Sequence, residues 1–559
     1  MEVLKTTGWL TPTGFHVPTA ALRRVFGAKY DKFLSKLTVV YKAKVGLPKR
    51  TPLYHYVGSE IYLPRTLILS LMRLTVIHQL AITIAAVPRV DLPTIIDLYP
   101  DQMLVVDHLI ATVFTPRRIA AGTATCIFNL RAGQGKTFVA AGVISAVGLP
   151  TLYIAPTCYL AEQAVKDLTT VLGPVAIEYT AGAGVKKRAA IAAAHVVVIT
   201  IDSALRLSDE TYARFGLVVM DEVHMYCSDV RMRIFQRCTW CVLGLTATSE
   251  ALTKGRDPIL KQSLAFLSDD IIRAENIPGF AYRNDEKFTC VANIVKYSGP
   301  PSHTKFLTHA STDMLFTHYM HEQFLDDSIR LQLAVCKLIQ LFDWRGPTDQ
   351  RHRIYVFAEE IKLLRAAKHA FERMLMKYGR SDIVHALGIE DPDVDVAIDA
   401  PDAPNGISTG MFTGGTKIGE VNDIRVLFAT YGFAGQGVSI VDMTAILLLT
   451  PRRANFMQIF ARILRRGSDL SIPRVIIDIN DVCTALRGQL SARLPAYEFY
   501  EFDVTYTKIG YEDVYAYAVA TVTPRLVDAY WIHMLILREC ITADLRPRII
   551  RTFIRSCIG

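Results

Sequence analysis

Residues 126–137 read Cys-Ile-Phe-Asn-Leu-Arg-Ala-Gly-Gln-Gly-Lys-Thr, and this stretch decides the fold. An apolar run at Thr125–Leu130 leads into a glycine-rich turn, and Phe138–Ile144 then has the composition of a buried helix. Strand, glycine loop and helix in this order predict a phosphate-binding loop in an α/β protein. Glycine lets the backbone fold around phosphate oxygens with its amide hydrogens pointing inward, and the helix start adds its positive dipole end.

Six consecutive residues form the predicted nucleotide site: Ala132, Gly133, Gln134, Gly135, Lys136 and Thr137. We expect Lys136 to neutralise the β- and γ-phosphates of ATP and Thr137 to ligate Mg²⁺. One residue departs from the common pattern, because Leu130 occupies the place of the motif's first glycine. Taken alone, the motif has a chance glycine-rich turn as its alternative.

A second motif lies 85 residues further on, where Asp221-Glu222-Val223-His224 directly follows the apolar run Leu217–Met220. Carboxylates at the carboxyl end of a buried parallel strand face the ligand crevice of an α/β sheet. Asp221 is therefore expected to hold Mg²⁺, and Glu222 to orient or deprotonate the attacking water. His224 is expected to connect this site to its surroundings.

Short apolar runs alternate with helix-compatible segments in two parts of the chain, which is typical of buried parallel strands joined by helices. The first part contains Thr125–Leu130, Thr151–Ala155, His195–Ile199, Leu217–Met220 and Cys241–Leu245, and the second Arg353–Phe357, Arg425–Ala429, Ala445–Leu449 and Arg474–Ile479. Two doubly wound units are predicted, with Ser311–Phe342 between them as helix.

Together these motifs resemble those of a superfamily-two helicase of the Asp-Glu-x-His type. Upstream, Tyr99-Pro100-Asp101-Gln102 is similar to the family's Arg-Pro-Tyr-Gln element, which implies that Gln102 contacts adenine. Ala155-Pro156-Thr157 is similar to motif Ia and Thr180-Ala181-Gly182 to motif Ib. Thr246-Ala247-Thr248 matches motif III, which implies that Thr246 and Thr248 couple hydrolysis to strand movement.

The second unit carries the family's remaining motifs. Tyr355–Glu359 is similar to motif IV, Phe412–Gly415 to a turn that grips the nucleic-acid backbone, and Ala429-Thr430 with Gly435–Ser439 to motif V. Residues 458–465 match Gln-x-x-Gly-Arg-x-x-Arg with Ala461 in place of glycine. The resemblance covers about 96–485 and implies two RecA-like lobes with ATP between them. It further implies that Gly435 and Gly437 contact the nucleotide and that Gln458, Arg462 and Arg465 complete the catalytic site.

A motor that moves along nucleic acid must ignore sequence, so its contacts should be made to phosphate and sugar. The candidates are Pro156, Thr157, Thr180, Gly182, Thr200, Gly414, Gly415 and Thr430. Threonine and glycine are also ordinary turn and cap residues, which is the alternative for these positions.

The composition of the chain limits the class of protein it can be. The chain has 559 residues, 51% hydrophobic residues, ten scattered cysteines and a formal charge of +9, which favours a folded, reduced, intracellular protein. Leu67–Val87 is largely apolar, but Arg73 interrupts it, so a buried amphipathic helix is preferred to a membrane span. Cys238 and Cys241, with Cys227 nearby, have metal-like spacing but no second ligand pair, which favours buried thiols over zinc.

We expect four regions: an N-terminal accessory domain (1–95), an ATP-binding RecA-like domain (96–280), a second RecA-like domain (281–490) and a C-terminal accessory region (491–559). Residues 389–405 are expected to form an acidic loop, and scattered lysines give the first region a basic character. Residues 61–65, 413–417 and 431–437 make the chain similar to helicases of large DNA viruses of eukaryotes. That likeness implies viral replication, repair or late transcription in the host nucleus or a cytoplasmic factory, with packaging in the virion as a further implication.

DNA is favoured over RNA as the partner, although phosphate contacts dominate both and do not separate them. Two other functions stay open, a nucleic-acid-binding scaffold built on a decayed motor and the motor subunit of a restriction-type nuclease. The intact Lys136, Asp221 and Arg462 argue against the scaffold. The nuclease would need a separate partner, because no nuclease constellation stands in the tails.

Overall fold

The computed structural model describes residues 6–41, 49–84, 87–131, 133–174, 177–180, 194–226, 230–231, 233–237, 240–247, 271–282, 288–299, 324, 327–377, 409–412, 424–431, 442–450, 452, 456–465, 468–482 and 489–514. The chain divides into two compact units, Met1–Asn284 and Asp285–Gly559. Each unit is described by itself.

A sheet of seven parallel strands forms the centre of the first unit, in the order β10-β11-β9-β12-β13-β8-β14. Its strands are β8 (Ala124–Asn129), β9 (Thr151–Ala155), β10 (Ile177–Thr180), β11 (Val196–Thr200), β12 (Leu217–Met220), β13 (Cys241–Thr246) and β14 (Ile271–Arg273). Every residue of β8, β9, β11, β12 and β13 is buried, as expected for strands covered on both faces.

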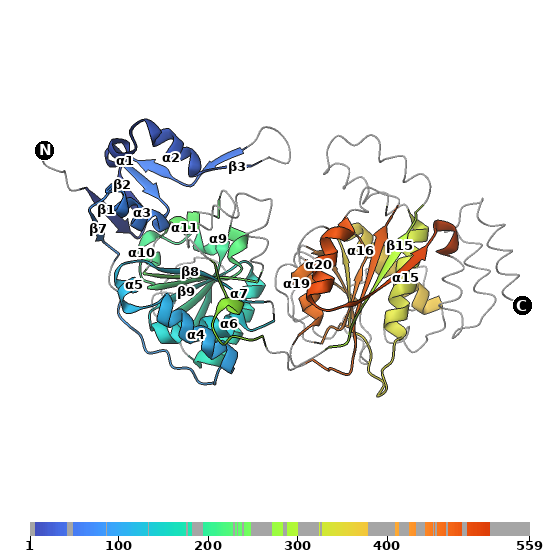
Figure 1. Cartoon of the computed structure of the whole chain (residues 1–559). Coiled ribbons are helices and arrows are strands. Elements are labelled where there is room, and N and C mark those ends of the chain that lie inside the picture. The colour runs from blue at the N-terminus through green and yellow to red at the C-terminus, as the bar shows by residue number, and fades with distance from the viewer. Residues whose placement is uncertain are drawn as a thin grey trace, which may run out of the picture. The chain divides into compact units, whose positions relative to one another are not determined.

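Helices cover both faces of this sheet (Figure 1). The larger core is formed with α4 (Pro100–Thr112), α6 (Lys136–Val147) and α7 (Cys158–Leu172). The second core is formed with α9 (Ile201–Ala204), α10 (Asp209–Tyr212) and α11 (Arg233–Gln236). This is the doubly wound architecture that the sequence predicts.

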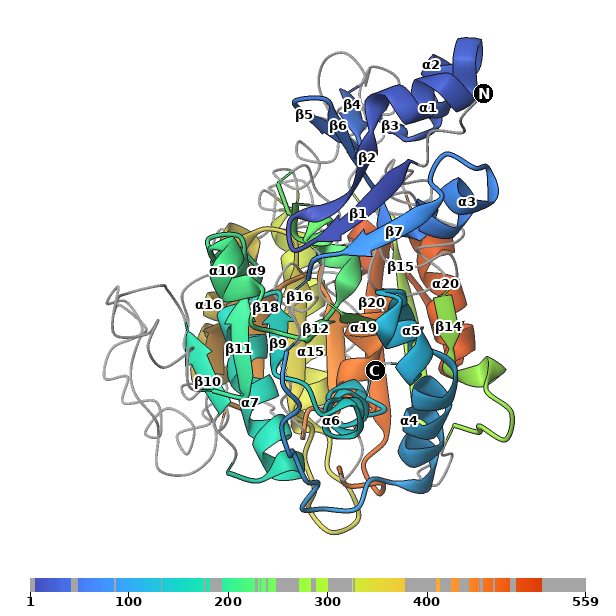
Figure 2. The same ribbon diagram turned by 90° about the vertical axis from the view of Figure 1, so that its left-hand side faces the viewer.

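A small N-terminal module, residues 6–84, precedes the parallel sheet. Its own five-stranded sheet has the order β5-β6-β2-β1-β7, and Figure 2 shows these strands side by side. The strands are β1 (Thr7–Thr11), β2 (Gly14–Pro18), β5 (His55–Val57), β6 (Glu60–Leu63) and β7 (Gln79–Ile82). The helices α1 (Thr19–Phe26), α2 (Tyr30–Lys36) and α3 (Ile68–Arg73) complete a separate apolar core, and β3 (Thr38–Tyr41) pairs with β4 (Lys49–Pro52).

The helix predicted over Leu67–Val87 is wrong. Only Ile68–Arg73 is α-helical, and Gln79–Ile82 is instead the edge strand β7, which pairs in parallel with β1. Thr75 has a φ of 53°, so the chain turns there, and the following β-branched pair Val76-Ile77 packs into the module's core. No helix among the described residues has the length and apolarity needed to cross a bilayer.

The module packs against the amino ends of the neighbouring parallel strands. The Arg65 guanidinium donates to the carbonyl of Gly122, two residues before β8. Gly122 has a φ of 63°, and a Cβ there would collide with Leu10 of the module. Trp240 packs against both apolar cores, which joins the module to the rest of the first unit.

The second unit is built on another sheet of seven parallel strands, in the order β17-β18-β16-β19-β20-β15-β21. Its strands are β15 (Cys290–Tyr297), β16 (Ile354–Ala358), β17 (Thr409–Phe412), β18 (Val426–Thr430), β19 (Ala445–Leu448), β20 (Arg474–Asp481) and β21 (Asp503–Ile509). The helices α15 (Ser328–Asp343) and α16 (Ile361–Lys377) cover one face, and α19 (Phe456–Phe460) and α20 (Leu490–Phe499) lie against the other (Figure 1).

Two buried ion pairs fasten helices to β20. The Arg330 guanidinium of α15 forks onto Asp481, with Nε 2.7 Å from Oδ1 and Nη2 2.9 Å from Oδ2. The Arg493 guanidinium of α20 forks onto Asp478 at 2.8 and 3.0 Å. Residues 490–509 therefore belong to this sheet, and the predicted boundary after 490 falls at the start of α20.

All nine strands predicted from the apolar runs are present, each within one or two residues of the predicted bounds. The strands β10, β14, β15, β17 and β21 and the N-terminal sheet were missed. In β15 Asn293 and Lys296 interrupt the apolar residues, and β21 is largely exposed, so neither shows a continuous apolar run. The helix predicted over Ser311–Phe342 is confirmed from Ser328 to its end, and 389–405 lies outside the described residues.

Candidate nucleotide and nucleic-acid site

The glycine loop leaves β8 and enters α6 through left-handed backbone. Gly133 has a φ of 80° and Gly135 a φ of 78°, a conformation that side-chain-bearing residues rarely adopt. Gly135 is also the N-cap of α6, so the free amide groups of the helix start lie directly after it. Ala132 lies outside the described residues. The loop has the backbone that an anion-binding turn requires.

Gln102 contacts the glycine loop directly. Its amide Nε2 donates to the carbonyl of Gln134 at 3.3 Å, and its Oε1 accepts from the backbone amide of Tyr99 at 3.2 Å. The side chain is buried, and a Cβ on Gly135 would collide with its Nε2. Gln102 therefore braces the loop from α4, while its predicted contact with adenine stays a prediction.

Lys136 and Glu222 form an ion pair at the centre of the site. Lys136 Nζ lies 2.9 Å from Glu222 Oε1, and both side chains are about six-sevenths buried, with exposed fractions of 13% and 15%. Glu222 has a φ of 47°, unusual for a non-glycine residue and typical of functional sites. In this structure the Glu222 carboxylate is thus the partner of the Lys136 ammonium group.

Asp221 lies at the end of β12, buried beneath this ion pair. One of its oxygens accepts from the backbone amide of Glu222 at 3.0 Å. Burial raises the pKa of the Asp221 carboxyl, and the adjacent Glu222 carboxylate raises it further, while Lys136 opposes both. The hydroxyl of Tyr153, on the neighbouring strand β9, lies beside both Asp221 and Thr137.

Tyr153 was missed in the sequence. The run Thr151–Ala155 is largely apolar, with Thr151 and this phenol as its hydroxyl groups. Burial together with Asp221 raises the pKa of Tyr153 well above its ordinary value, so the phenol hydroxyl stays neutral. No signal in the sequence set Tyr153 apart, because the pairing of β9 with β12 is a feature of the fold.

His224 connects the carboxylates to β13. Its Nδ1 lies 3.4 Å from Glu222 Oε2 and 3.2 Å from Thr246 Oγ1. Burial lowers the pKa of His224, Glu222 opposes this and Lys136 adds to it. The carbonyl of Thr246 in turn accepts from the backbone amide of Leu130 at 3.1 Å, where the glycine loop begins.

These contacts close a ring: glycine loop, Lys136, Glu222, His224, Thr246 and back to the loop at Leu130. Leu130 packs its side chain into the larger core of the unit, which is why a leucine is accepted at the place of the usual glycine. The second residue predicted for coupling, Thr248, lies outside the described residues.

The predicted nucleic-acid contacts of the first unit follow the carboxyl ends of three neighbouring strands. Pro156 and Thr157 follow β9, Thr180 ends β10 and Thr200 ends β11. The Thr157 hydroxyl caps α7 by accepting from the Leu160 amide, and the Thr200 hydroxyl caps α9 by accepting from the Ser203 amide, each at 3.3 Å. The cap role that threonine commonly plays is thus present at both positions. Gly182 lies outside the described residues.

In the second unit, Gln458 lies in α19 and Arg462 in the 3₁₀ turn η7 (Ala461–Ile463) that continues it. Both side chains are buried, whereas Arg465 is partly exposed and Thr430 ends β18 half-buried. Gly414, Gly415, Gly435 and Gly437 lie outside the described residues. The predicted roles of this group stay predictions.

The site residues fit Mg²⁺ by their chemistry. A buried carboxylate on Asp221 and the hydroxyl of Thr137, with Tyr153 between them, offer the hard oxygen ligands that Mg²⁺ prefers. Among the described residues no cluster of three or more His, Cys, Asp or Glu could hold a metal by itself. Cys241 is a buried thiol with its pKa raised to about 12 by burial, as expected, while Cys227 and Cys238 lie outside the described residues.

Two parallel α/β sheets, together with a glycine loop bearing a lysine and a carboxylate box at strand ends of the same sheet, are the features of a superfamily-two, ATP-dependent helicase, the class that this chain resembles. Residues 95–251 match the family model described as "Type III restriction enzyme, res subunit".

Most of the chain is similar to proteins of African swine fever virus that are named as helicases. "Putative ATP-dependent RNA helicase QP509L" of isolate Tick/Malawi/Lil 20-1/1983 is 25% identical over 504 residues, covering 87% of this chain and 90% of the viral protein. The protein of the same name from the Badajoz 1971 Vero-adapted strain is 25% identical over 511 residues, with the same coverage. The predicted likeness to helicases of large DNA viruses is confirmed.

Two solved structures are also similar to this chain. Dbp5 of S. cerevisiae bound to RNA and ADP BeF3 is 12% identical, with a TM-score of 0.43 and coverage of 76% of this chain and 97% of that one. The DNA-bound restriction-modification enzyme LlaBIII is 11% identical, with a TM-score of 0.47 and coverage of 79% and 34%.

Proposed function

We propose that this protein is an ATP-driven motor that moves along or unwinds nucleic acid, with 96–280 and 281–490 as its two motor lobes. The observation that carries the proposal is the ring of contacts from Lys136 through Glu222 and His224 to Thr246. This ring connects Lys136, which would hold the γ-phosphate, to Thr246 at the end of β13, whose contacts would change when the phosphate leaves. A motor needs this connection, and a simple nucleotide-binding scaffold does not.

Hydrolysis would begin by exchanging the partner of Lys136. In the structure the ammonium group is paired with Glu222, whose carboxylate takes the place of a phosphate oxygen. When ATP binds, Lys136 turns to the β- and γ-phosphates, and Glu222 becomes available to accept a proton from the attacking water. Mg²⁺, held by Thr137 and Asp221, would neutralise charge developing on the phosphate oxygens.

The second lobe would supply further positive charge to the γ-phosphate during hydrolysis. Arg462 and Arg465 follow Gln458 at helical spacing, and an arginine finger brought to the γ-phosphate is worth about 10³–10⁵ in rate. Gly435 and Gly437 would complete the nucleotide site, and Gln102 would contact adenine. Since such an arginine acts only when the lobes close, hydrolysis would depend on lobe movement.

Nucleic acid would lie along the strand ends that carry Thr157, Thr180 and Thr200, and in the second lobe along Gly414, Gly415 and Thr430. In the order of the first sheet, β10, β11 and β9 lie to one side of the carboxylate strand β12, and β8 lies to the other. The Thr157 hydroxyl already accepts from a helix amide, so we expect it to donate to a phosphate oxygen. The Thr200 hydroxyl donates to Ser203 Oγ at 3.0 Å and would exchange this acceptor for a phosphate oxygen.

DNA is the proposed substrate, in viral replication, repair or transcription. RNA is the second candidate, because the similar viral proteins carry the words RNA helicase in their names. The experiment measures ATP hydrolysis alone and with single-stranded DNA, duplex DNA or RNA, next to a Lys136→Ala variant. We expect one polymer to stimulate ATP hydrolysis. We expect the Lys136→Ala variant to hydrolyse ATP at least about a hundred-fold more slowly. Equal hydrolysis with and without every polymer would overturn the motor proposal, and an active variant would overturn the site.

A further inference from the structure

Four aromatic rings stand in register across four strands of the N-terminal module. His55 of β5 pairs with Tyr62 of β6, Tyr62 with His16 of β2, and His16 with Trp9 of β1. The ring centroids are 4.6, 4.7 and 5.5 Å apart in that order, and the planes of successive rings differ by 17°, 24° and 14°. The rings therefore form one continuous stack, which we name the ring ladder.

The ring ladder is not part of the module's core. Successive side chains of a strand point to opposite faces, and Leu10, Phe15 and Ile61 are the buried neighbours on these strands. All four ladder residues are partly exposed. The ladder thus occupies the face of the sheet opposite the helices α1 and α2, whose residues belong to the core.

One place in the ladder lacks a ring. The next strand after β1 is the edge strand β7, and the residue paired with Trp9 there is Ala81. The rings of the ladder stack on one another, and the residue in register with Trp9 on the side away from His16 is Ala81, which has only a methyl group. Neighbouring strands are about 4.8 Å apart, so the missing ring leaves a slot close to one aromatic ring thick. Polar groups border it, since Gln79 donates to Thr7 on the same two strands at 3.1 Å.

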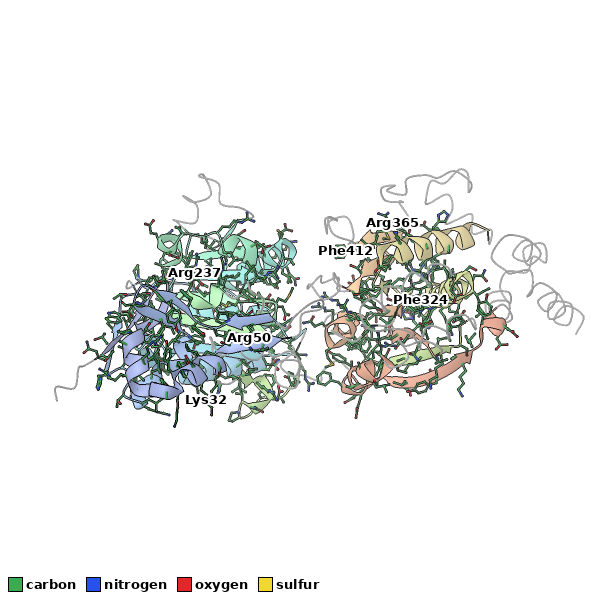
Figure 3. The ribbon with its side chains drawn as sticks, turned by 90° about the horizontal axis from the view of Figure 1, so that it is seen from above. Lys32, Arg50, Arg237, Phe324, Arg365 and Phe412 are labelled. Atoms are coloured by element: carbon green, nitrogen blue, oxygen red, sulfur yellow. The ribbon has the colours of Figure 1, made fainter. Side chains whose placement is uncertain are left out.

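The positive charge of the chain is concentrated in this module. Residues 1–84 contain twelve lysines and arginines and three acidic residues, a formal charge of +9 that equals the charge of the whole chain. The other 475 residues carry 50 basic and 50 acidic side chains. Lys32 of α2 and Arg50 of β4 are among the exposed cations and are seen on the module in Figure 3.

We propose that the N-terminal module is a second nucleic-acid site, at which a base of a single strand stacks on Trp9 in the slot above Ala81. A partly exposed aromatic ring accepts any base, and the net positive charge of the module attracts the phosphates, a combination typical of proteins that bind single strands without sequence preference. A base from either DNA or RNA has this chemistry. The site would hold the strand independently of ATP, which gives the proposed motor a fixed grip.

The test measures binding of fluorescent oligothymidylate, oligouridylate and an abasic oligomer of equal length to the full chain without nucleotide. We expect Trp9→Ala and Ala81→Phe each to weaken binding of the two base-bearing oligomers about 5- to 150-fold, the worth of one stacked base. Binding of the abasic oligomer should stay unchanged, because its phosphate charge is the same. Tryptophan emission should fall when base-bearing oligomers bind and should fall less in Trp9→Ala.

Ala81→Ser is the matched control, since it leaves the slot open and should bind as the unaltered chain does. Trp9→Phe retains a ring and should lose less binding of the base-bearing oligomers than Trp9→Ala. This difference separates an effect on stacking from damage to the module. The proposal would be overturned if the variants lost binding equally for base-bearing and abasic oligomers, or if Ala81→Phe lost no binding. The ring ladder would then serve only to stabilise the sheet.

This site goes beyond the proposed motor function, and its outcome is separable from that function. Lys136→Ala, which removes hydrolysis, should retain the base-dependent binding. Binding that depends on Trp9 in a chain whose hydrolysis ignores nucleic acid would keep this site and overturn only the motor.

Discussion

His224 Nδ1 lies 3.2 Å from Thr246 Oγ1, and through this contact the carboxylate box on β12 meets the end of β13. The same threonine holds the first residue of the glycine loop through its backbone carbonyl, at 3.1 Å from the Leu130 amide. Glu222 is therefore connected to both ends of the phosphate-binding loop, directly through Lys136 and indirectly through His224 and Thr246. This arrangement leads to the first prediction.

His224→Ala and Thr246→Val should each leave ATP binding in place and lower the stimulation of hydrolysis by nucleic acid. The two residues share one contact, so the double variant should lose hardly more than either single one, with a coupling of about 0.5–3 kcal/mol. The measurement is hydrolysis with and without polymer in all four proteins. Thr246→Ser retains the hydroxyl and is the matched control. Strictly additive losses would show that the contact does not carry the coupling.

Glu222→Gln should bind ATP more tightly than the unaltered chain and hydrolyse it far more slowly. Without nucleotide, Lys136 is paired with Glu222 at 2.9 Å, and ATP must break that pair to reach the lysine. A glutamine holds the lysine less strongly, yet it cannot accept the proton of the attacking water. Equilibrium binding of a fluorescent ATP analogue and single-turnover hydrolysis test both parts, with Glu222→Asp as the control that retains the charge. Weaker binding by the glutamine variant would contradict this account.

Nine strands of the two parallel sheets could be predicted because burial on both faces leaves continuous apolar runs such as Leu217–Met220. The glycine loop and the carboxylate box could be placed because each follows such a run. The ring ladder could not be predicted, since Trp9 and Tyr62 become neighbours only through the antiparallel register of a sheet that no motif indicates.

Side-chain partners inside the site were equally out of reach. Gln102 was assigned to adenine by resemblance, but its contact with the Gln134 carbonyl depends on how α4 packs beside the loop. Tyr153 could not be separated from its apolar neighbours, because only the pairing of β9 with β12 places its hydroxyl beside Asp221. Local sequence predicts an element, whereas these contacts arise from packing between elements distant in the chain.

Gly135→Ala should weaken nucleotide binding even when the crowding by Gln102 is removed. A Cβ at this position would collide with Gln102, and the backbone φ of 78° costs a non-glycine residue about 1–2 kcal/mol. The double variant Gly135→Ala, Gln102→Ala relieves only the collision, so it should remain defective. Titration with a fluorescent ATP analogue measures this, and Gln102→Ala alone is the control. Full recovery in the double variant would show that crowding, not backbone conformation, requires the glycine.

Arg493→Met should destabilise the second unit by about 3–5 kcal/mol. The substitution leaves the fully buried Asp478 carboxylate without its guanidinium partner, although Tyr497 still donates to it at 3.0 Å. Arg493→Met with Asp478→Leu removes both charges and should lose much less. Hydrogen exchange of the β20 amides measures the effect, because α20 is fastened to that strand. Equal protection in the single variant and the unaltered chain would contradict the prediction.

The second unit should lose stability as the pH falls from 7 to 5, and His352 should account for part of the loss. Burial lowers the pKa of His352 to about 3, and the nearby Arg425 and Arg474 add to the effect, while its ring stacks on Trp344 at a centroid distance of 4.3 Å. The folded pKa lies below the ordinary value of about 6.5, so the unfolded chain binds the proton first. Stability present above pH 6.5 is therefore lost as the pH drops toward 3, by about 2 kcal/mol between pH 7 and 5.

Exchange protection of the β16 and β19 amides at both pH values measures this loss. The imidazole Nδ1 lies 3.0 Å from Thr444 Oγ1, so His352→Gln retains a hydrogen-bonding group there and removes the titration. The variant should be less stable than the unaltered chain at pH 7 and should lose less on acidification. An equal acid-induced loss in both proteins would show that other groups, and not this neutral histidine, set the acid sensitivity of the unit.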